Sequence, residues 1–228
     1  MYNNKKVTLL IPCYNEEKGI EKLLQEKFSF IDEFIVVDNN SNDNTAGIAR
    51  QRGVVISVVK RGYGLAYQAG LAMASGDIIV MMDGDSSYSI SEAERLVIYM
   101  ETNKYDFITG CRFPLSDIRA MPWVKKVSNY LISGLIRKIF YINLMDSQSG
   151  LFVFKRDLLP KIVSPNPGMG FSQELKLNAW LGLYKCAEMH IDYRARVGKV
   201  KFKTVIDSFK TLYGIIVFWF SHRKNMFI

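Results

Sequence analysis

Short apolar runs recur along the first half of the chain, spaced so that one helix fits between neighbours. They are rich in Val, Ile, Leu, Phe and Met, and lie at residues 7–11, 34–37, 54–59, 78–82 and 107–110. Short β-favouring runs bounded by polar or turn residues are typical of buried strands. The pattern therefore predicts five strands in this half.

Segments with helical spacing or capping signals separate these strands, at residues 15–24, 45–52, 65–74 and 91–100. Asn15 is the predicted N-cap of the first, and Ser91 with Glu94 forms a predicted capping box at the start of the fourth. Strands that alternate with helices at this spacing predict an α/β fold with a Rossmann-like, mostly parallel sheet flanked by helices.

The second half is less regular. Helices are predicted at 123–142 and 172–183, a strand at 151–155, and a helix at 205–220 that is amphipathic at first and then almost wholly apolar. The segments 123–142 and 205–220 pair aromatic and aliphatic residues with basic flanks, which is typical of interfacial membrane helices, although helices that cover a sheet can share the pattern. No apolar run reaches the ~18 residues needed to span a bilayer.

Charge is divided unevenly along the chain. Residues 1–110 contain 11 Lys or Arg and 15 Asp or Glu, for a net charge of −4, whereas residues 111–228 contain 19 and 7, for +12. A basic half indicates an anionic partner, such as nucleic acid, anionic lipid or a phosphorylated substrate, or else a solvated basic surface. The three cysteines are widely spaced without a CxxC pair, which argues against a zinc or disulfide framework.

Polar clusters follow three of the predicted strands, at Pro12–Glu16, Asp38–Ser41 and Asp83–Asp85. Ligands of open α/β sheets bind beyond the carboxyl ends of the strands. We therefore expect the three clusters to meet at one edge of the sheet and to form the active site there.

Asp83 and Asp85 are separated by one glycine just after a buried strand. Mg²⁺ and Mn²⁺ prefer carboxylate and phosphate oxygens, so this pair suits a metal that also grips a diphosphate. Because Asp and Gly favour turns, a plain turn is the alternative.

A second candidate anion site lies at Arg61, Gly62 and Gly64, before an Ala-rich helix. Glycines there let backbone N–H groups approach an anion. Tyr67 occupies the place of the third glycine in the dinucleotide fingerprint, which excludes an NAD site.

Eight short segments together resemble glycosyltransferase family 2. The segments at 7–17, 36–45, 61–66 and 82–85 resemble successive motifs of the family, and those at 110–112, 146–150, 171–174 and 193–201 resemble its dolichol-phosphate mannose synthase branch. The resemblance covers about residues 5–205. It implies a GT-A fold and inverting transfer of a sugar from a donor such as GDP-mannose or UDP-glucose to a polyprenyl or dolichyl phosphate.

The same resemblance implies a set of donor-site residues. Those expected around the nucleotide sugar are Pro12, Tyr14, Glu16, Asp38, Asn39, Arg61, Gly62, Gly64, Asp83 and Gly84. Asp83 and Asp85 are the expected ligands of Mg²⁺ or Mn²⁺. The family often has Asp at the position of Asn39, and this departure leaves the nucleotide open.

The second half carries the other candidate catalytic residues. A departing nucleoside diphosphate gains negative charge, which Arg196 and Lys201 could offset, unless they belong to a solvated edge strand. Glu174 and Asp146 are candidate general bases for a hydroxyl acceptor, which must lose a proton. Arg112 is expected to bind a lipid phosphate, because its guanidinium group can donate to two oxygens at once. The alternative is that Arg112 forms an ordinary surface ion pair.

These patterns predict a GT-A domain at residues 1–205 and an amphipathic tail at 206–228 that holds the protein peripherally at the cytoplasmic face of a membrane. One alternative is a family 2 enzyme that glycosylates a sugar hydroxyl of a growing glycan. A nucleic-acid-binding protein is a remote alternative, because no aromatic-basic RNA motif is present. For the same reason we expect no nucleic-acid partner. A sugar nucleotidylyltransferase is a further α/β alternative, but it would need a Gly-rich loop after the first strand, where this chain has Pro12-Cys13-Tyr14-Asn15.

Overall fold

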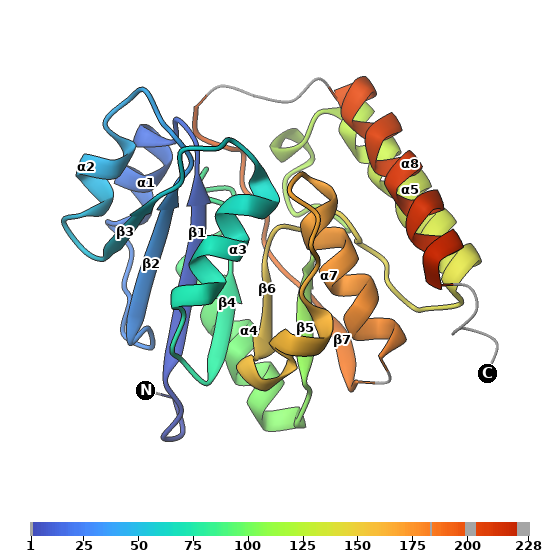
Figure 1. Ribbon diagram of the computed structural model, residues 1–228, viewed down its shortest axis with the longest axis horizontal. Helices are drawn as coiled ribbons and strands as arrows, with labels where there is room; N and C mark the ends of the chain where they lie inside the picture. Colours follow the sequence, from blue (N-terminus) through green and yellow to red (C-terminus); the bar gives the residue numbers. More distant parts are fainter. Residues whose placement is uncertain (1, 183, 199–203, 223–228) are drawn as a thin grey trace.

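The computed structural model describes residues 2–182, 184–198 and 204–222, and the side chains of these except 204–210. A single seven-stranded sheet forms the centre, with helices on both faces (Figure 1). The strands are β1 (Val7–Cys13), β2 (Glu33–Asp38), β3 (Val54–Ser57), β4 (Ile78–Met81), β5 (Phe107–Cys111), β6 (Phe152–Lys155) and β7 (Cys186–His190). Their order is β3-β2-β1-β4-β6-β5-β7.

The sheet is mixed but mostly parallel, which confirms the predicted fold class. Strands β1 to β3 run parallel to one another and β4 runs parallel to β1, whereas β6 is antiparallel to both β4 and β5, and β7 is parallel to β5. Parallel neighbours place their carboxyl ends at one edge. The segments that follow β1, β2 and β4 therefore lie together, as the sequence predicts.

The helices are α1 (Glu17–Leu23), α2 (Thr45–Ala49), α3 (Tyr63–Met73), α4 (Ile90–Asn103), α5 (Trp123–Phe140), α6 (Leu159–Ile162), α7 (Gly170–Leu181) and α8 (Thr204–His222). Two 3₁₀ turns lie at Ile118–Ala120 and Arg156–Leu158. The long helices appear where helical spacing predicts them.

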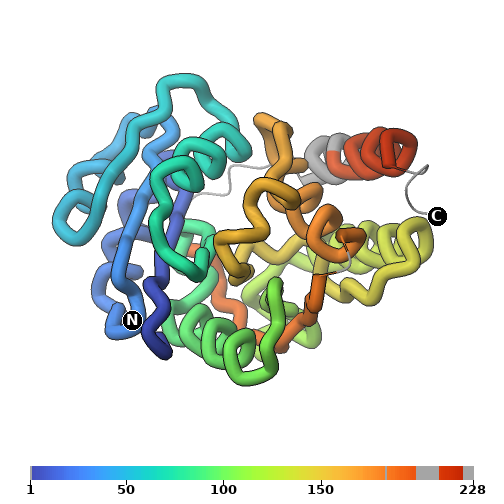
Figure 2. The backbone as a smooth tube through the Cα atoms, turned by 60° about the horizontal axis from the view of Figure 1, so that its bottom comes forward, coloured from blue at the N-terminus to red at the C-terminus, as the bar shows by residue number. Residues whose placement is uncertain are grey.

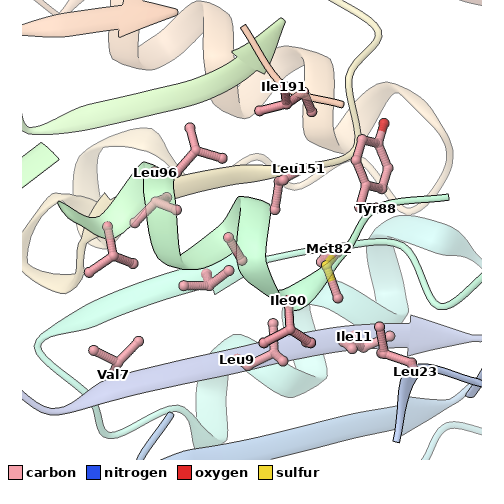
Figure 3. Packing of buried hydrophobic residues seen from close by; sticks show 14 of the residues in the cluster. Val7, Leu9, Ile11, Leu23, Met82, Tyr88, Ile90, Leu96, Leu151 and Ile191 are labelled. Atoms are coloured by element: carbon pink, nitrogen blue, oxygen red, sulfur yellow. The ribbon is translucent and has the colours of Figure 1, made fainter. Parts of the chain in front are cut away.

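Alternating side chains of the central strands fill two separate cores. Val7, Leu9 and Ile11 of β1 pack with α1 and α4 on one face (Figure 3), whereas Leu10 packs with α3 and α7 on the other. Because successive side chains of a strand point to opposite faces, a strand covered on both faces must be apolar throughout. This is why the central strands read as continuous apolar runs.

The two predicted capping residues are wrong. Asn15 does not cap α1; its Oδ1 accepts from the backbone N–H of Asn42 at 2.7 Å, so it ties together the loops after β1 and β2. The N-cap of α4 is Ser89, whose hydroxyl accepts from the N–H of Glu92, and not Ser91. The edge strand β7 was not predicted, because its sequence CAEMH is too mixed to show a strand pattern.

Helices α5 and α8 lie side by side at one end of the molecule in both views (Figures 1 and 2). They enclose a third apolar cluster, formed by Ile132, Ile136, Phe140, Leu144, Leu177, Ile215 and Phe218. Leu177 belongs to α7, so this cluster joins α8 to the rest of the fold. Within the described part of the chain, no helix combines the length and the apolarity needed to cross a bilayer.

Candidate functional site

A cavity of about 800 Å³ opens at the carboxyl ends of β1, β2 and β4. Most of the predicted site residues line it: Pro12, Tyr14, Glu16, Asn39, Arg61, Gly62, Asp83, Gly84, Asp85, Glu174 and Arg196. The far wall is apolar and comes from α7 and α8, including Leu177, Ile215 and Phe218. One cavity therefore joins a polar sheet edge to an apolar helix pair.

Asp83 and Asp85 face this cavity from the loop after β4. Asp83 Oδ1 accepts from the Tyr63 hydroxyl at 3.1 Å, and Asp85 Oδ1 accepts from the N–H of Ser87 at 3.0 Å. Burial, and next the charge of Asp85, raise the pKa of Asp83 to about 6. Two crowded carboxylates of this kind fit a divalent cation, which would relieve their repulsion.

Asp83 and Asp85 offer too few ligand atoms to hold a metal ion without further ligands. Among the described residues, no group of three or more His, Cys, Asp or Glu side chains could hold a metal ion. The two carboxylates would thus leave coordination positions for phosphate oxygens and water, as Mg²⁺ sites at phosphates commonly do.

Arg196 lies directly against the carboxylates of Glu16 and Asp85. Its Nη2 donates to Glu16 Oε1 at 2.8 Å, and its Nη1 lies 3.6 Å from Asp85 Oδ2. The backbone N–H groups of Arg194 and Val197 donate to the carbonyls of Ser87 and Asp85, which pins this segment beside the loop after β4. Lys201, predicted to act with Arg196, lies outside the described residues.

Asn39 holds a loop rather than offering free groups to a nucleotide. Its Oδ1 accepts from the N–H of Gly62 at 2.7 Å, and its Nδ2 donates to the carbonyls of Val58 and Lys60. An Asp here could not donate to those carbonyls. The same loop places the Arg61 guanidinium 4.5 Å above the Tyr14 ring, at the cavity wall.

Two other predicted donor-site residues are not among those that line the cavity. Asp38 is buried, and its Oδ1 has no hydrogen-bond partner within the described part of the chain. Gly64 donates its N–H to the carbonyl of Pro167 at 3.0 Å, and a Cβ at Gly64 would lie 2.0 Å from the Asn166 carbonyl. The prediction that Gly64 presents its N–H to an anion is therefore wrong.

Arg112 and Asp146 form a buried ion pair, which corrects both of their predicted roles. Arg112 is 2% exposed and Asp146 0%, and the guanidinium donates to both carboxylate oxygens at 2.7 Å. Burial alone would raise the pKa of Asp146, but Arg112 and its hydrogen bonds lower it below the usual range. Asp146 is thus the ion-pair partner of Arg112 rather than an available base, and the two guanidinium nitrogens expected to bind a phosphate donate to Asp146 instead.

Glu174 faces the cavity from α7 but is also engaged. Its Oε1 accepts from the Asn166 amide at 2.6 Å, and its Oε2 accepts from the Ser164 hydroxyl. It fixes the loop that forms part of the cavity wall. To act as a general base it would have to exchange one of these partners for the acceptor hydroxyl.

Comparison with known proteins assigns the family. Residues 8–163, more than half of the chain, match the family described as glycosyl transferase family 2. The chain belongs to glycosyltransferase family 2.

Curated relatives and solved structures resemble the chain over most of its length. The chain is 30% identical to an uncharacterised glycosyltransferase of Mycobacterium tuberculosis, over 84% of this chain and 87% of the relative. It is 28% identical to the dolichyl-phosphate hexose transferase of Haloferax volcanii, over 88% of each chain. Among solved structures, glucosyl-3-phosphoglycerate synthase of Mycobacterium tuberculosis, bound to Mn²⁺ and UDP-glucose, superposes with a TM-score of 0.78 at 21% identity, covering 94% of this chain and 80% of that one. This likeness shows the GT-A fold.

Three residues in or beside this cavity were not predicted from the sequence. Tyr63, the variable residue between two glycines, binds Asp83. Gln173 lines the cavity, and its Nε2 is buried without a hydrogen-bond partner within the described part of the chain. Lys125 of α5 lies close enough for Asp83 and Asp85 to favour its charged form, although burial and next Arg112 lower its pKa overall. Its only sequence signal was a basic position beside an apolar helix face.

Asp146→Ala should lower the free energy of unfolding by about 3–5 kcal/mol, because it leaves the buried guanidinium of Arg112 unpaired. Urea unfolding measures this. The exposed pair Asp117–Arg119 supplies the control, since Asp117→Ala should leave the free energy of unfolding close to that of the wild type. Because the folded-state pKa of Asp146 is lowered, its contribution is present above about pH 4 and is lost only on further acidification. Full stability with abolished transfer would instead support a catalytic base.

Proposed function

We propose that this chain transfers a hexose from a nucleotide sugar, of the GDP-mannose or UDP-glucose type, to a polyprenyl or dolichyl phosphate with inversion. The observation that carries the proposal is the single cavity that joins Asp83 and Asp85 to the apolar wall of α7 and α8. The end with Asp83 and Asp85 suits the diphosphate of a nucleotide sugar, and the apolar end at α7 and α8 suits an isoprenoid chain. Relatives named as dolichyl-phosphate and undecaprenyl-phosphate transferases add support.

The donor would lie at the carboxyl edge of the sheet. Asp83 and Asp85 would hold Mg²⁺ or Mn²⁺, which would neutralise charge on the diphosphate. Arg196 lies on the same side and offers a fixed positive charge to the departing nucleoside diphosphate. Asp38, whose buried Oδ1 has no partner among the described residues, is a candidate acceptor for an N–H group of the base.

The acceptor chemistry follows from how the carboxylates of the cavity are engaged. In the described part of the chain, each carboxylate that lines the cavity has a partner: Glu16 binds Arg196, Asp83 binds Tyr63, Asp85 binds Ser87 and Glu174 binds Asn166. A lipid phosphate arrives already anionic and needs positioning rather than deprotonation. With Arg112 buried, Lys125 is the candidate that positions it, since it lies near both Asp83 and Asp85.

The lipid end of the cavity lies beside an apolar surface on α5 and α8. Large apolar side chains stay exposed there: Trp123, Val127, Tyr130, Leu131, Tyr213, Ile216, Val217 and Phe220. The two helices lie side by side at one end of the molecule (Figure 2), so these residues can reach a membrane while the sheet stays in water. We place the enzyme peripherally at the cytoplasmic face, held by α5 and by residues 206–228.

A second candidate, transfer to a sugar hydroxyl of a glycan, is favoured by one observation. Glu174 lies in the cavity and is held only by the neutral side chains of Asn166 and Ser164, so an acceptor hydroxyl could replace either of them. Slower transfer to a hydroxyl acceptor in Glu174→Gln, without an effect on a lipid phosphate acceptor, would separate the two candidates.

Asp85→Ala should abolish transfer and Mn²⁺ binding but retain the fold, because it removes a metal ligand from a loop beyond the strand. Titration of Mn²⁺ in the presence of UDP or GDP, followed by electron paramagnetic resonance, measures the binding. The exposed Asp157, outside this cavity, supplies the control Asp157→Ala, which should bind Mn²⁺ as the wild type does. Full activity of Asp85→Ala, or of the wild type in excess chelator, would contradict the metal site.

Arg196→Ala should lower kcat by about 10²–10³-fold with a smaller effect on KM, because the guanidinium acts on charge that develops as the diphosphate leaves. Steady-state kinetics with saturating acceptor measure both constants. Arg194→Ala is the matched control, since Arg194 pairs with Glu26 outside the cavity at 2.7 Å. A change confined to KM would mark Arg196 as a ground-state contact of the donor.

Leu131→Glu should weaken cosedimentation with anionic liposomes and slow transfer to a long polyprenyl phosphate in those liposomes. The reason is that Leu131, 70% exposed on α5, would place a charge at the headgroup boundary. Transfer to a short, water-soluble polyprenyl phosphate should not change. Ile98→Glu on α4, at a residue that is 40% exposed, is the control. A wild-type protein that ignores liposomes and glycosylates only a soluble sugar would contradict the lipid acceptor.

A further inference from the structure

Lys176 of α7 is a fully buried cation that the proposed transfer reaction does not use. It is 0% exposed, and its Nζ donates to the carbonyl of Ser147 at 3.0 Å and to that of Ser149. It also lies 5.1 Å from the centre of the Phe152 ring. Removing a cation from water is costly unless it is well paired, so its two carbonyl partners must hold it firmly.

The carbonyl of Ser149 belongs to a peptide unit that is gripped at both ends. Lys176 binds its oxygen, and the N–H of Gly150 donates to the Tyr88 hydroxyl at 2.7 Å. Tyr88 is itself buried in the core beside Leu151 (Figure 3). The peptide between Ser149 and Gly150 therefore has a fixed position and orientation.

Asp83 rests on this peptide. A Cβ at Gly150 would lie 2.1 Å from Asp83 Oδ2 and 2.6 Å from its Cγ, so the carboxylate is in direct contact with the backbone of Gly150. The other carboxylate oxygen is held by Tyr63 at 3.1 Å. Tyr63 and the backbone of Gly150 together set where the carboxylate can lie.

We propose that Lys176 is a positioning residue that fixes Asp83 for the divalent cation, acting through the peptide between Ser149 and Gly150. It does not line the cavity, whereas its neighbours Gln173, Glu174 and Leu177 on α7 do. The inference rests on the proposed metal site at Asp83 and Asp85. It adds that the helix forming the acceptor wall also sets the metal ligand.

The electrostatics agree with a retained ammonium group. Burial lowers the pKa of Lys176 to about 8, while Asp146 and Asp83 favour its charged form and Arg112 opposes it. Glu188 of β7 adds a further negative charge and binds the N–H groups of Met145 and Asp146. The loop is thus fixed from α7 on one side and from β7 on the other.

Lys176→Met tests the proposal, because methionine is an unbranched side chain only one atom shorter than lysine but cannot donate a hydrogen bond. We expect the dissociation constant of Mn²⁺, measured by electron paramagnetic resonance with excess UDP or GDP, to rise about 10–100-fold, the usual effect of losing a partner that orients a metal ligand. The kcat should recover in part at high Mn²⁺. Gly150→Ala, which displaces Asp83 directly, should weaken Mn²⁺ binding similarly.

Leu96→Ala on α4 controls for a general loss of stability, because Leu96 is fully buried in the core on the other face of the sheet. It should lower the unfolding midpoint in urea without changing Mn²⁺ affinity. If Lys176→Met does not fold, Tyr88→Phe removes the second grip on the peptide and should raise the dissociation constant in the same direction.

The outcomes separate the two levels of the proposal. Wild-type affinity for Mn²⁺ in the folded Lys176→Met variant, or in Tyr88→Phe if that variant is used, would overturn the positioning role while leaving the metal site intact. A wild-type protein that binds no Mn²⁺, and an Asp85→Ala variant that behaves as the wild type, would overturn the metal site itself, and with it the inference.

Discussion

Asp83 and Asp85 bring two like charges into one partly buried cavity, and the surrounding structure is organised around their repulsion. Burial, and next the charge of Asp85, raise the pKa of Asp83 to about 6, and a bound cation would relieve the repulsion. Protein cations approach the pair from different elements: Arg196 from the segment after β7 and Lys125 from α5. The first half of the chain thus supplies the carboxylates, and the basic second half supplies the positive charges that face them.

The strands of the first half, the long helices and the meeting of the loops after β1, β2 and β4 were predicted correctly. Each strand of the first half is a short apolar run, and the polar residues that follow it form one edge because parallel strands end together. The pattern of residues alone therefore placed Asp83 and Asp85 beside the loops after β1 and β2, and the cavity contains all three segments. The motif resemblance to family 2 added the expected donor, and the family itself is confirmed.

What could not be predicted depends on which distant partner a side chain finds. Arg112 has the right chemistry to bind a phosphate, but Asp146, 34 residues later, takes its fork inside the core. Asn15 is a residue type that often caps helices, yet its side-chain oxygen accepts a hydrogen bond from Asn42 in the loop after β2. Lys176 lies on an ordinary helical pattern, and only the fold shows that its amine reaches the loop beneath Asp83. Residue type alone did not distinguish these choices.

The placement of the buried charges bears on the kind of acceptor. Arg112 pairs with Asp146, and Lys176 binds carbonyls of the loop at 145–150, so these buried charges fix the loop that contacts Asp83. A hydroxyl acceptor would have to displace Asn166 or Ser164 from Glu174, whereas an acceptor phosphate needs a nearby cation and a route for its chain. Under the proposed function, Lys125 of α5 would supply the cation, and the apolar wall of Ile215 and Phe218 on α8 would receive the chain. Under the proposed function, the sheet edge would hold the sugar donor, and the paired helices α5 and α8 would bring the lipid phosphate to it.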